Sequence, residues 1–254
     1  MMNTAQRLQY EENLGMRQLH ASGKFYLNQD GSLGERKDSL LSINTNWVNE
    51  LFKTGLIQSH DLSIRGGSEK TKYFASLNYY DQDGTLPSSA YKRIGLKLNL
   101  DHSLSKSFKI GMSNTLAQES RKDVLTGTNG GGMNTLNPVF GAYALLPYLK
   151  PYNEDGELID FRSGLFRTPY FYYSMSAADE KRLKLVNTIF AEWQIVDFLK
   201  FKSTLGSDYY TRNSYNYLSP EWQKDIEGDK GYSARGFGDE QNITNTNLFT
   251  FRKS

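Results

Sequence analysis

The sequence contains no cysteine among its 254 residues. This absence excludes disulfide scaffolds, thiol nucleophiles and thiolate metal sites. Only three histidines are present, His20, His60 and His102, and their separation along the chain does not match a metal-ligand motif. The formal net charge is +2, so no strong field of one sign favours nucleic acid or another highly charged partner.

Long hydrophobic runs are also missing, and the mean hydropathy is −0.62. The longest apolar stretch runs from Val139 to Leu149 and contains Gly141 and Pro147. It is well short of the ~20 residues that a membrane-spanning helix needs, which excludes a helical membrane protein. The first ten residues, MMNTAQRLQY, lack the basic and apolar regions of a signal peptide.

Aromatic residues are abundant, with 17 Tyr, 14 Phe and 3 Trp, and hydrophobic residues recur with the period of two that is typical of β-strands. In the segment 91–100, for example, Ile94, Leu96 and Leu98 alternate with polar residues and glycine. This pattern predicts an all-β fold with about seven strands, near residues 57–66, 71–82, 91–102, 106–118, 181–197, 199–212 and 241–253.

The chain divides at about residue 55. Residues 1–55 are predicted to form short helices and loops, with an N-cap at Asn3-Thr4, a helix stop at Gly15 and a second helix that ends at Gly55. Residues 56–254 hold the strands. Their connections alternate between tight hairpins, at 66–70, 103–105 and 197–198, and long loops, at about 119–180 and 213–240. Long strands with short turns at one rim and long loops at the other are typical of an outer-membrane β-barrel. A soluble β-sandwich with one solvated face gives the same alternation of side chains.

Particular stretches of sequence are more specific than the periodicity. The run from Asn46 to Gly84, NWVNELFKTGLIQSHDLSIRGGSEKTKYFASLNYYDQDG, closely resembles a segment of SusC/RagA-type TonB-dependent transporters. The stretch Asn153–Gly156, NEDG, resembles the long loop of that family, and Phe201–Tyr210 resembles a later strand. The resemblance covers nearly the whole chain.

The resemblance implies a segment of a transmembrane antiparallel barrel of about 22 strands, plugged by an N-terminal domain. Such a barrel lies in the outer membrane of a Gram-negative bacterium, in contact with its lipid. It imports oligosaccharides or oligopeptides with a SusD-like surface lipoprotein and draws its energy from the TonB complex. The sequence contains no signal peptide, plug domain or closing C-terminal strands, so the chain is expected to be an internal slice of the barrel. The alternative is a soluble all-β glycan-binding module.

No residue pattern indicates catalysis, a bound metal or a cofactor, and we expect the protein not to be an enzyme. Ser103 and Lys106 match the spacing S-x-x-K, but they lie in a predicted hairpin turn rather than on a helix. The glycine run 130–132 lacks the Gly-Lys-Ser/Thr sequence of a phosphate loop. The Asp-Gly pairs at 83–84 and 155–156 are typical of turns rather than of calcium loops.

Aromatic residues of the long loops are the candidates for solute contact, because sugar rings stack on aromatic faces. The selected residues are Tyr148, Tyr152, Tyr170, Tyr172 and Trp222. Tyr215 and Tyr217 are further candidates in the second loop. Aromatic side chains can equally serve to pack a loop on itself or on a partner. By parity we expect Lys97, Lys109, Lys184 and Lys202 to share the lumen-facing side of the strands, although any solvated polar face would carry such residues.

Overall fold

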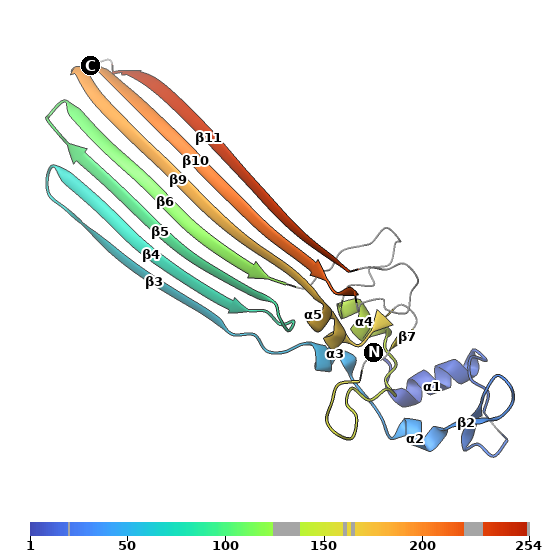
Figure 1. Cartoon of the computed structure of the whole chain (residues 1–254). Coiled ribbons are helices and arrows are strands. Elements are labelled where there is room, and N and C mark those ends of the chain that lie inside the picture. The colour runs from blue at the N-terminus through green and yellow to red at the C-terminus, as the bar shows by residue number, and fades with distance from the viewer. Residues whose placement is uncertain (20, 124–137, 160–161, 164–165, 221–230, 253–254) are drawn as a thin grey trace.

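The computed structural model describes residues 1–19, 21–123, 138–159, 162–163, 166–220 and 231–252. Most of these residues form one antiparallel sheet, in the order β11-β10-β9-β6-β5-β4-β3 (Figure 1). Its strands are β3 (Ile57–Gly67), β4 (Thr71–Asp83), β5 (Ala90–Ser103), β6 (Phe108–Lys122), β9 (Ser176–Val196), β10 (Leu199–Leu218) and β11 (Tyr232–Phe251). The seven predicted strands are therefore confirmed.

The short and long connections lie at opposite ends of this sheet. The tight turns after β3, β5 and β9 are together at the end that also holds the C-terminus in Figure 1, whereas the helices and the long connections are at the other end. The predicted sorting of the loops is confirmed, but their bounds were too wide. β10 continues to Leu218 and β11 starts at Tyr232. The backbone pairing continues past the apolar residues, where charged side chains on both faces hide the alternation.

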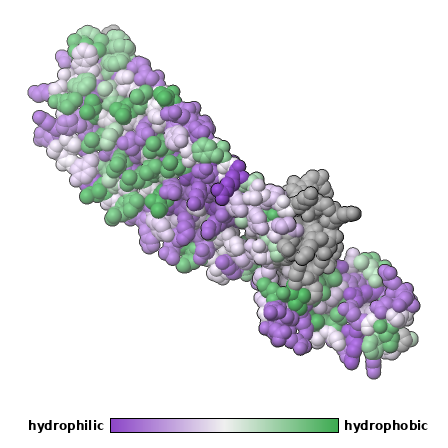
Figure 2. Space-filling view, viewed as in Figure 1, coloured by the Kyte–Doolittle hydropathy of each residue, from purple (hydrophilic) through white to green (hydrophobic). Residues whose placement is uncertain are grey.

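The two faces of the sheet differ in chemistry. The register places residues of one parity together across neighbouring strands; Leu62, Leu77, Leu96, Leu116 and Leu185, for example, form one row. We call the side that carries this row the apolar face. Its hydrophobic side chains are exposed, Leu62 by 71% and Ile189 by 56%. Hydrophobic side chains also cluster over the sheet in Figure 2, and hydrophilic ones gather where it meets the helical part.

The opposite side, the polar face, carries Arg93, Lys97, Thr115, Lys184 and their row neighbours. The described part of the chain covers neither face of the sheet with a second layer, so the apolar face has no protein partner within it. A sheet that keeps its hydrophobic side chains exposed needs an apolar surrounding, because burial of apolar area is the main favourable contribution to stability.

The helices form a separate packed unit next to the long-loop end of the sheet. Its elements are α1 (Thr4–Asn13), β1 (Phe25–Leu27), β2 (Leu33–Arg36), α2 (Lys37–Leu41), α3 (Trp47–Leu51), α4 (Pro138–Ala144), β7 (Arg162–Ser163), β8 (Phe166–Arg167) and α5 (Pro169–Met175). As predicted, Asn3 caps α1, its side chain accepting a hydrogen bond from the backbone N–H of Gln6, and Gly15 follows the helix with a φ of 69°. In the described residues, no helix has both the length and the apolar character needed to cross a membrane.

Two hydrophobic clusters join the N-terminal segment to the long connection between β6 and β9. In one, Leu8, Tyr26 and Leu40 pack with Tyr148; in the other, Trp47 and Leu51 pack with Ala142 and Leu145. The indole Nε1 of Trp47 also donates a hydrogen bond of 2.9 Å to the backbone oxygen of Leu146. Residues about a hundred or more positions apart in the sequence therefore pack together in these two clusters.

Candidate functional site

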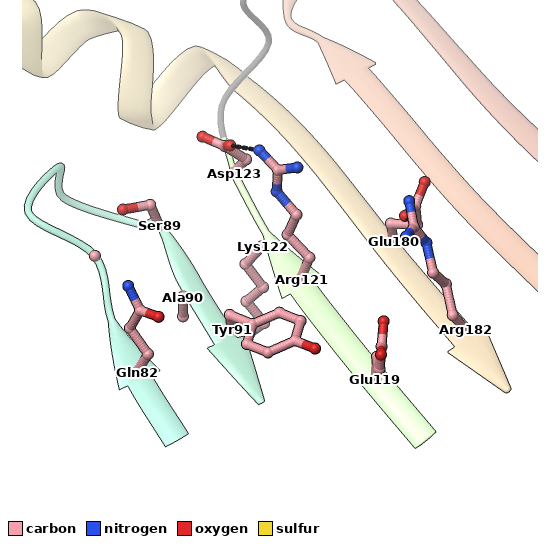
Figure 3. Close-up of a pocket in the computed structure, with 11 residues that line it drawn as sticks. Gln82, Ser89, Ala90, Tyr91, Glu119, Arg121, Lys122, Asp123, Glu180 and Arg182 are labelled. Atoms are coloured by element: carbon pink, nitrogen blue, oxygen red, sulfur yellow. Dashed lines mark hydrogen bonds and ion pairs between the residues drawn. The ribbon is translucent and has the colours of Figure 1, made fainter. Parts of the chain in front are cut away.

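A pocket opens on the polar face of the sheet, at the end next to the helical unit (Figure 3). Its volume is about 440 Å³. It is lined by the last residues of β4 and β6 and the first residues of β5 and β9, namely Gln82, Gly84, Ser89, Ala90, Tyr91, Glu119, Arg121, Lys122, Asp123, Glu180 and Arg182. The antiparallel order brings these strand ends together, because β4 and β6 finish where β5 and β9 begin.

The sheet register sets the positions of the charged side chains. Arg93, Glu119, Arg182 and Arg212 form one row across β5, β6, β9 and β10. The next row toward the pocket mouth contains Tyr91, Arg121 and Glu180. Glu119 thus lies between Arg93 and Arg182, and Arg121 lies opposite Glu180; opposite charges in such cross-strand positions stabilise a sheet. Arg182 and Arg212 are like charges opposite each other, and both pair with Glu180.

Specific ion pairs fix several of these groups. Glu180 pairs with both Arg182 and Arg212, and Arg121 pairs with Asp123 at 2.8 Å (Figure 3). The Glu180 side chain is only 13% exposed, whereas the Arg212 side chain is 55% exposed. Arg182 lines the pocket, Arg212 lies opposite it on β10, and the one carboxylate holds both partly exposed side chains. Such a surface offers hydrogen-bond donors and acceptors to a polar solute.

The four predicted lumen lysines all lie on the polar face. Lys97 pairs across the strands with Thr115, and Lys184 with Ala117 and Tyr210, on that face. Lys109 and Lys202 lie on either side of Glu192 in the register, close to the tight-turn end. Their ammonium groups approach the ring of Phe190, with Nζ to centroid distances of 5.6 and 4.4 Å. The parity argument is confirmed for all four.

The aromatic candidates divide into three groups. Tyr148 is buried, with 5% of its surface exposed, in the cluster with Leu8, so its ring is not available to a solute. Tyr172 lies in α5, and Trp222 lies outside the described residues. The placement of Tyr215 and Tyr217 in a loop was wrong, because both belong to β10.

Tyr152 and Tyr170 are brought together beside the helical unit. Their ring centroids are 6.3 Å apart and their hydroxyl groups 3.4 Å apart. Tyr170 also donates a hydrogen bond of 3.0 Å to the backbone oxygen of Glu50. Burial, and then the hydrogen bond with Tyr152, raise the pKa of Tyr170. Tyr152 is 41% exposed, so its ring is accessible for stacking.

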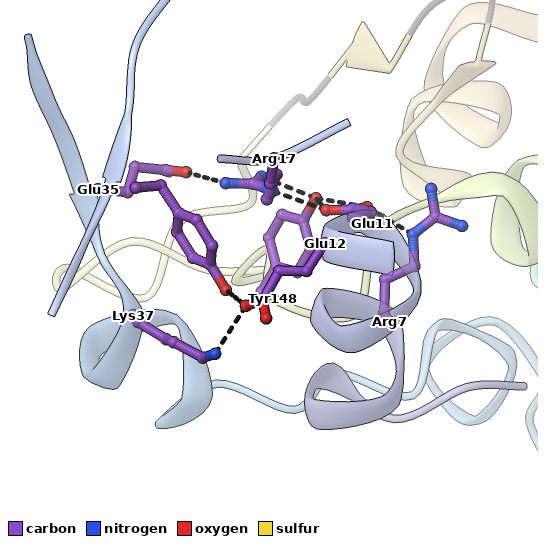
Figure 4. A network of polar contacts seen from close by, with 8 residues as sticks. Arg7, Glu11, Glu12, Arg17, Glu35, Lys37 and Tyr148 are labelled. Carbon is purple, nitrogen blue, oxygen red and sulfur yellow. Dashed lines mark hydrogen bonds and ion pairs between the residues drawn. The ribbon is translucent and has the colours of Figure 1, made fainter. Parts of the chain in front are cut away.

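A polar network that the sequence did not indicate anchors the helical unit (Figure 4). Glu11 is 4% exposed and accepts hydrogen bonds of 2.6 Å from Arg7 and from Arg17. Arg17 also bonds to Glu35 and to the Tyr148 hydroxyl, which ties residues 7–35 to the long connection. The spacing of Arg7 and Glu11 is the only part of this network that is visible in the sequence. The network holds the unit together.

In the described part of the chain, no group of three His, Cys, Asp or Glu side chains could hold a metal ion. The pocket presents a charged, hydrogen-bonding surface that also includes the ring of Tyr91. This chemistry suits binding of a polar solute.

The chain has clear relatives among curated proteins, although no family model matches it. It is 31% identical over 216 residues to TonB-dependent receptor P3 of Formosa agariphila, which covers 83% of this chain and 21% of that protein. It is 28% identical over 102 residues to TonB-dependent receptor SusC of Bacteroides thetaiotaomicron, over 40% of this chain and 10% of SusC. The chain thus spans at most about a fifth of the length of these relatives.

Solved structures show the same fold. The RagAB peptide importer in its closed-closed state superposes with a TM-score of 0.67 at 23% identity, over 83% of this chain and 24% of that chain. The open-open state gives a TM-score of 0.62 at 22% identity. Sequence and fold agree on the resemblance read from the Asn46–Gly84 run: the chain corresponds to part of a SusC/RagA-type TonB-dependent receptor and forms seven antiparallel strands of its barrel wall.

Proposed function

We propose that this chain forms part of the wall and the outer loops of a TonB-dependent transporter in the outer membrane of a Gram-negative bacterium. The transporter imports oligosaccharides or oligopeptides together with a SusD-like lipoprotein, with energy from the TonB complex. The names of the relatives support this proposal, since they are TonB-dependent receptors, and one solved structure with this fold is a peptide importer.

One structural observation carries the proposal. The sheet exposes rows of Leu and Ile side chains on one face and charged residues on the other, and its connections are sorted into short and long ends. This combination fits a barrel wall with lipid outside, an aqueous lumen inside and long loops at the cell surface. A soluble glycan-binding module would have to cover its apolar face with a second layer.

In this arrangement the charged pocket faces the lumen below the helical unit, where a solute would pass. Arg182, Arg212 and the exposed ring of Tyr152 offer the contacts that sugars and peptides use. Of the five aromatic candidates, we propose Tyr152, Tyr170, Tyr172 and Trp222 as solute contacts. Tyr148 belongs to the buried core instead.

The test is uptake by the full-length receptor in its native bacterium. We expect deletion of the receptor, of its lipoprotein partner or of TonB to abolish growth on the same oligosaccharide or oligopeptide mixture. The paired substitution Arg182→Ala and Arg212→Ala should lower the rate of uptake without lowering the amount of receptor in the outer membrane. Growth that is independent of TonB on every such mixture would contradict the proposal.

Membrane topology gives an independent check, because the chain has no cysteine of its own. A water-soluble maleimide should label a single cysteine placed at Lys97, on the polar face, far faster than one placed at Leu98, on the apolar face. Equal labelling at the two neighbouring positions would exclude a barrel wall.

A further inference from the structure

A second pocket, of about 480 Å³, lies at the ends of β9, β10 and β11 next to the long connections. It is lined by Asp179, Lys181, Asn213, Ser214, Tyr215, Arg235, Gly236 and Phe237. The register places Asp179, Tyr215 and Arg235 in one row, and Lys181, Asn213 and Phe237 in the next. Both rows have the parity of Leu183 and Leu185, so these side chains lie on the apolar face.

The pocket therefore lies where the apolar face ends, next to the long connections. Lys181 precedes Leu183 by two residues, which is about 7 Å along a strand. Phe237, beside Asn213, is 69% exposed on the same side. A ligand that reached this pocket from the lipid would have its polar part among the charged groups and its apolar part along the leucine rows.

The two cations of the pocket have no anionic partner within the described residues. No ion pair joins Lys181 or Arg235 to a carboxylate there, although the next residue of β9, Glu180, holds such pairs on the opposite face. The guanidinium carbon of Arg235 lies 5.4 Å from the ring centroid of Tyr215, which supports the side chain without neutralising it. β10 lies between the strands that carry the two cations, which places the backbones of Lys181 and Arg235 about 10 Å apart.

We propose that this pocket binds the phosphorylated headgroup of an outer-membrane lipid, with the acyl chains lying along Leu183 and Leu185. Guanidinium and ammonium groups are the usual protein partners of phosphate. The separation of Lys181 and Arg235 suits a headgroup that carries phosphates at both ends. Asp179 opposes the binding of an anion and limits its strength. This inference rests on the proposed function only in requiring that the apolar face contact lipid.

The experiment is native mass spectrometry of the full-length receptor in detergent with added diphosphorylated lipid A. We expect the receptor to retain this lipid and to bind the dephosphorylated form about tenfold more weakly or worse, since the charged contacts are lost. Lys181→Ala with Arg235→Ala should give a similar loss, whereas Asp179→Asn should strengthen binding. Lys97→Ala with Lys184→Ala, on the opposite face, is the charge-matched control and should leave lipid binding unchanged.

Two outcomes would overturn the inference: equal retention of both lipid forms, or equal lipid binding by the Lys181/Arg235 variant and the control. Competition by millimolar inorganic phosphate alone would assign the pocket to free phosphate rather than to a lipid. The maleimide labelling separates this result from the proposed function. A receptor that shows labelling at position 97 and protection at 98, yet does not discriminate between the two lipids, lacks the lipid site but keeps the barrel wall.

Discussion

Single glycines let aromatic rings lie flat on the sheet. The Phe190 ring covers Gly111 on the polar face, where an added Cβ would approach it to 2.4 Å and Asp101 Oδ1 to 2.6 Å. On the apolar face, Tyr73 covers Gly66, where an added Cβ would approach the hydroxyl oxygen to 2.5 Å. In each case the ring shields the backbone of the neighbouring strand, which compensates for the missing side chain.

We expect Gly111→Ala to destabilise the folded receptor by about 1–3 kcal/mol, because the methyl group displaces the Phe190 ring. Gly206→Ala is the matched control, since the nearest atoms to its added Cβ, on Thr244, are 3.9 Å away. Urea unfolding of the receptor in detergent micelles measures both. In a Phe190→Ala background the effect of Gly111→Ala should become smaller, because only the contact with Asp101 Oδ1 remains. An undiminished effect would show that the ring is not its cause.

Glu12 gives the helical unit a dependence on pH. Its hydrogen bond from Lys37, at 2.6 Å, and then that from Tyr26 lower the pKa of the Glu12 carboxyl below the ordinary value of 4.5. The unfolded chain therefore takes up the proton first as the pH falls, so the stabilisation is complete above pH 4.5 and is lost below it. Hydrogen exchange of amides in β1 and α2, corrected for the intrinsic rate, should show this loss in the parent protein and less of it in Glu12→Gln. Identical pH profiles would contradict the assignment.

The helices and loops behave as one element of structure rather than as separate connections. α3 precedes β3 and α4 follows β6, the first and fourth strands of the large sheet along the chain. Trp47 and Leu51 of α3 are nevertheless completely buried against Ala142 and Leu145. The buried residues of the described chain are concentrated here, while the sheet itself has almost none. The unit thus has its own core and depends on the sheet mainly for the positions of its ends.

Trp47→Ala should release the long connection from the N-terminal segment. Removal of the buried indole costs about 3–5 kcal/mol, and the substitution also removes the hydrogen bond to Leu146. We expect faster proteolysis and faster hydrogen exchange in residues 138–149. Tyr143→Ala, in the same connection but 61% exposed, serves as the control and should change neither rate. An unchanged proteolysis rate in Trp47→Ala would mean that the two segments do not depend on each other.

At the scale of the whole molecule, the difference between the two faces determines where charges are tolerated. Leu98 and Asn99 are neighbours in β5 but lie on the apolar and the polar face. We expect Leu98→Lys to destabilise the folded receptor in a bilayer, lowering its free energy of unfolding by about 2–4 kcal/mol, and Asn99→Lys to have little effect. Denaturant titration of the receptor in lipid vesicles measures the two values. A similar cost at both positions would place both faces in the same environment.

The strands were predictable because apolar and polar residues alternate along them, as they do over the seven residues from Ile94 to Leu100. Their ends next to the long connections were not, because there the sheet pairs charged with polar residues, as at Thr211 and Asp239. The period-two pattern indicates whether each face of a strand lies in a polar or an apolar environment. The backbone hydrogen bonds, in contrast, continue wherever a partner strand is present.

The site was predictable only in part. Parity placed the four lysines on the polar face correctly because it requires no knowledge of tertiary structure. The burial of Tyr148 depends on contacts with Leu8 and Arg17, more than 130 residues away, which no local pattern indicates. The charged pocket likewise depends on β6 and β9 being neighbours, although a long connection separates them in the chain.

The order of strands also has a consequence for the speed of folding. Every neighbouring pair in the sheet is joined by a short connection except β6 with β9, where roughly fifty residues intervene, and β10 with β11. Hairpins can form locally and add one after another, but joining β6 to β9 requires closing a long loop, and each doubling of loop length costs about 0.6 kcal/mol. If the clusters around Trp47 and Tyr148 form first, they shorten the loop that remains to be closed. Their formation would then determine when the two halves of the sheet meet, which makes the helical unit the rate-limiting part of sheet assembly.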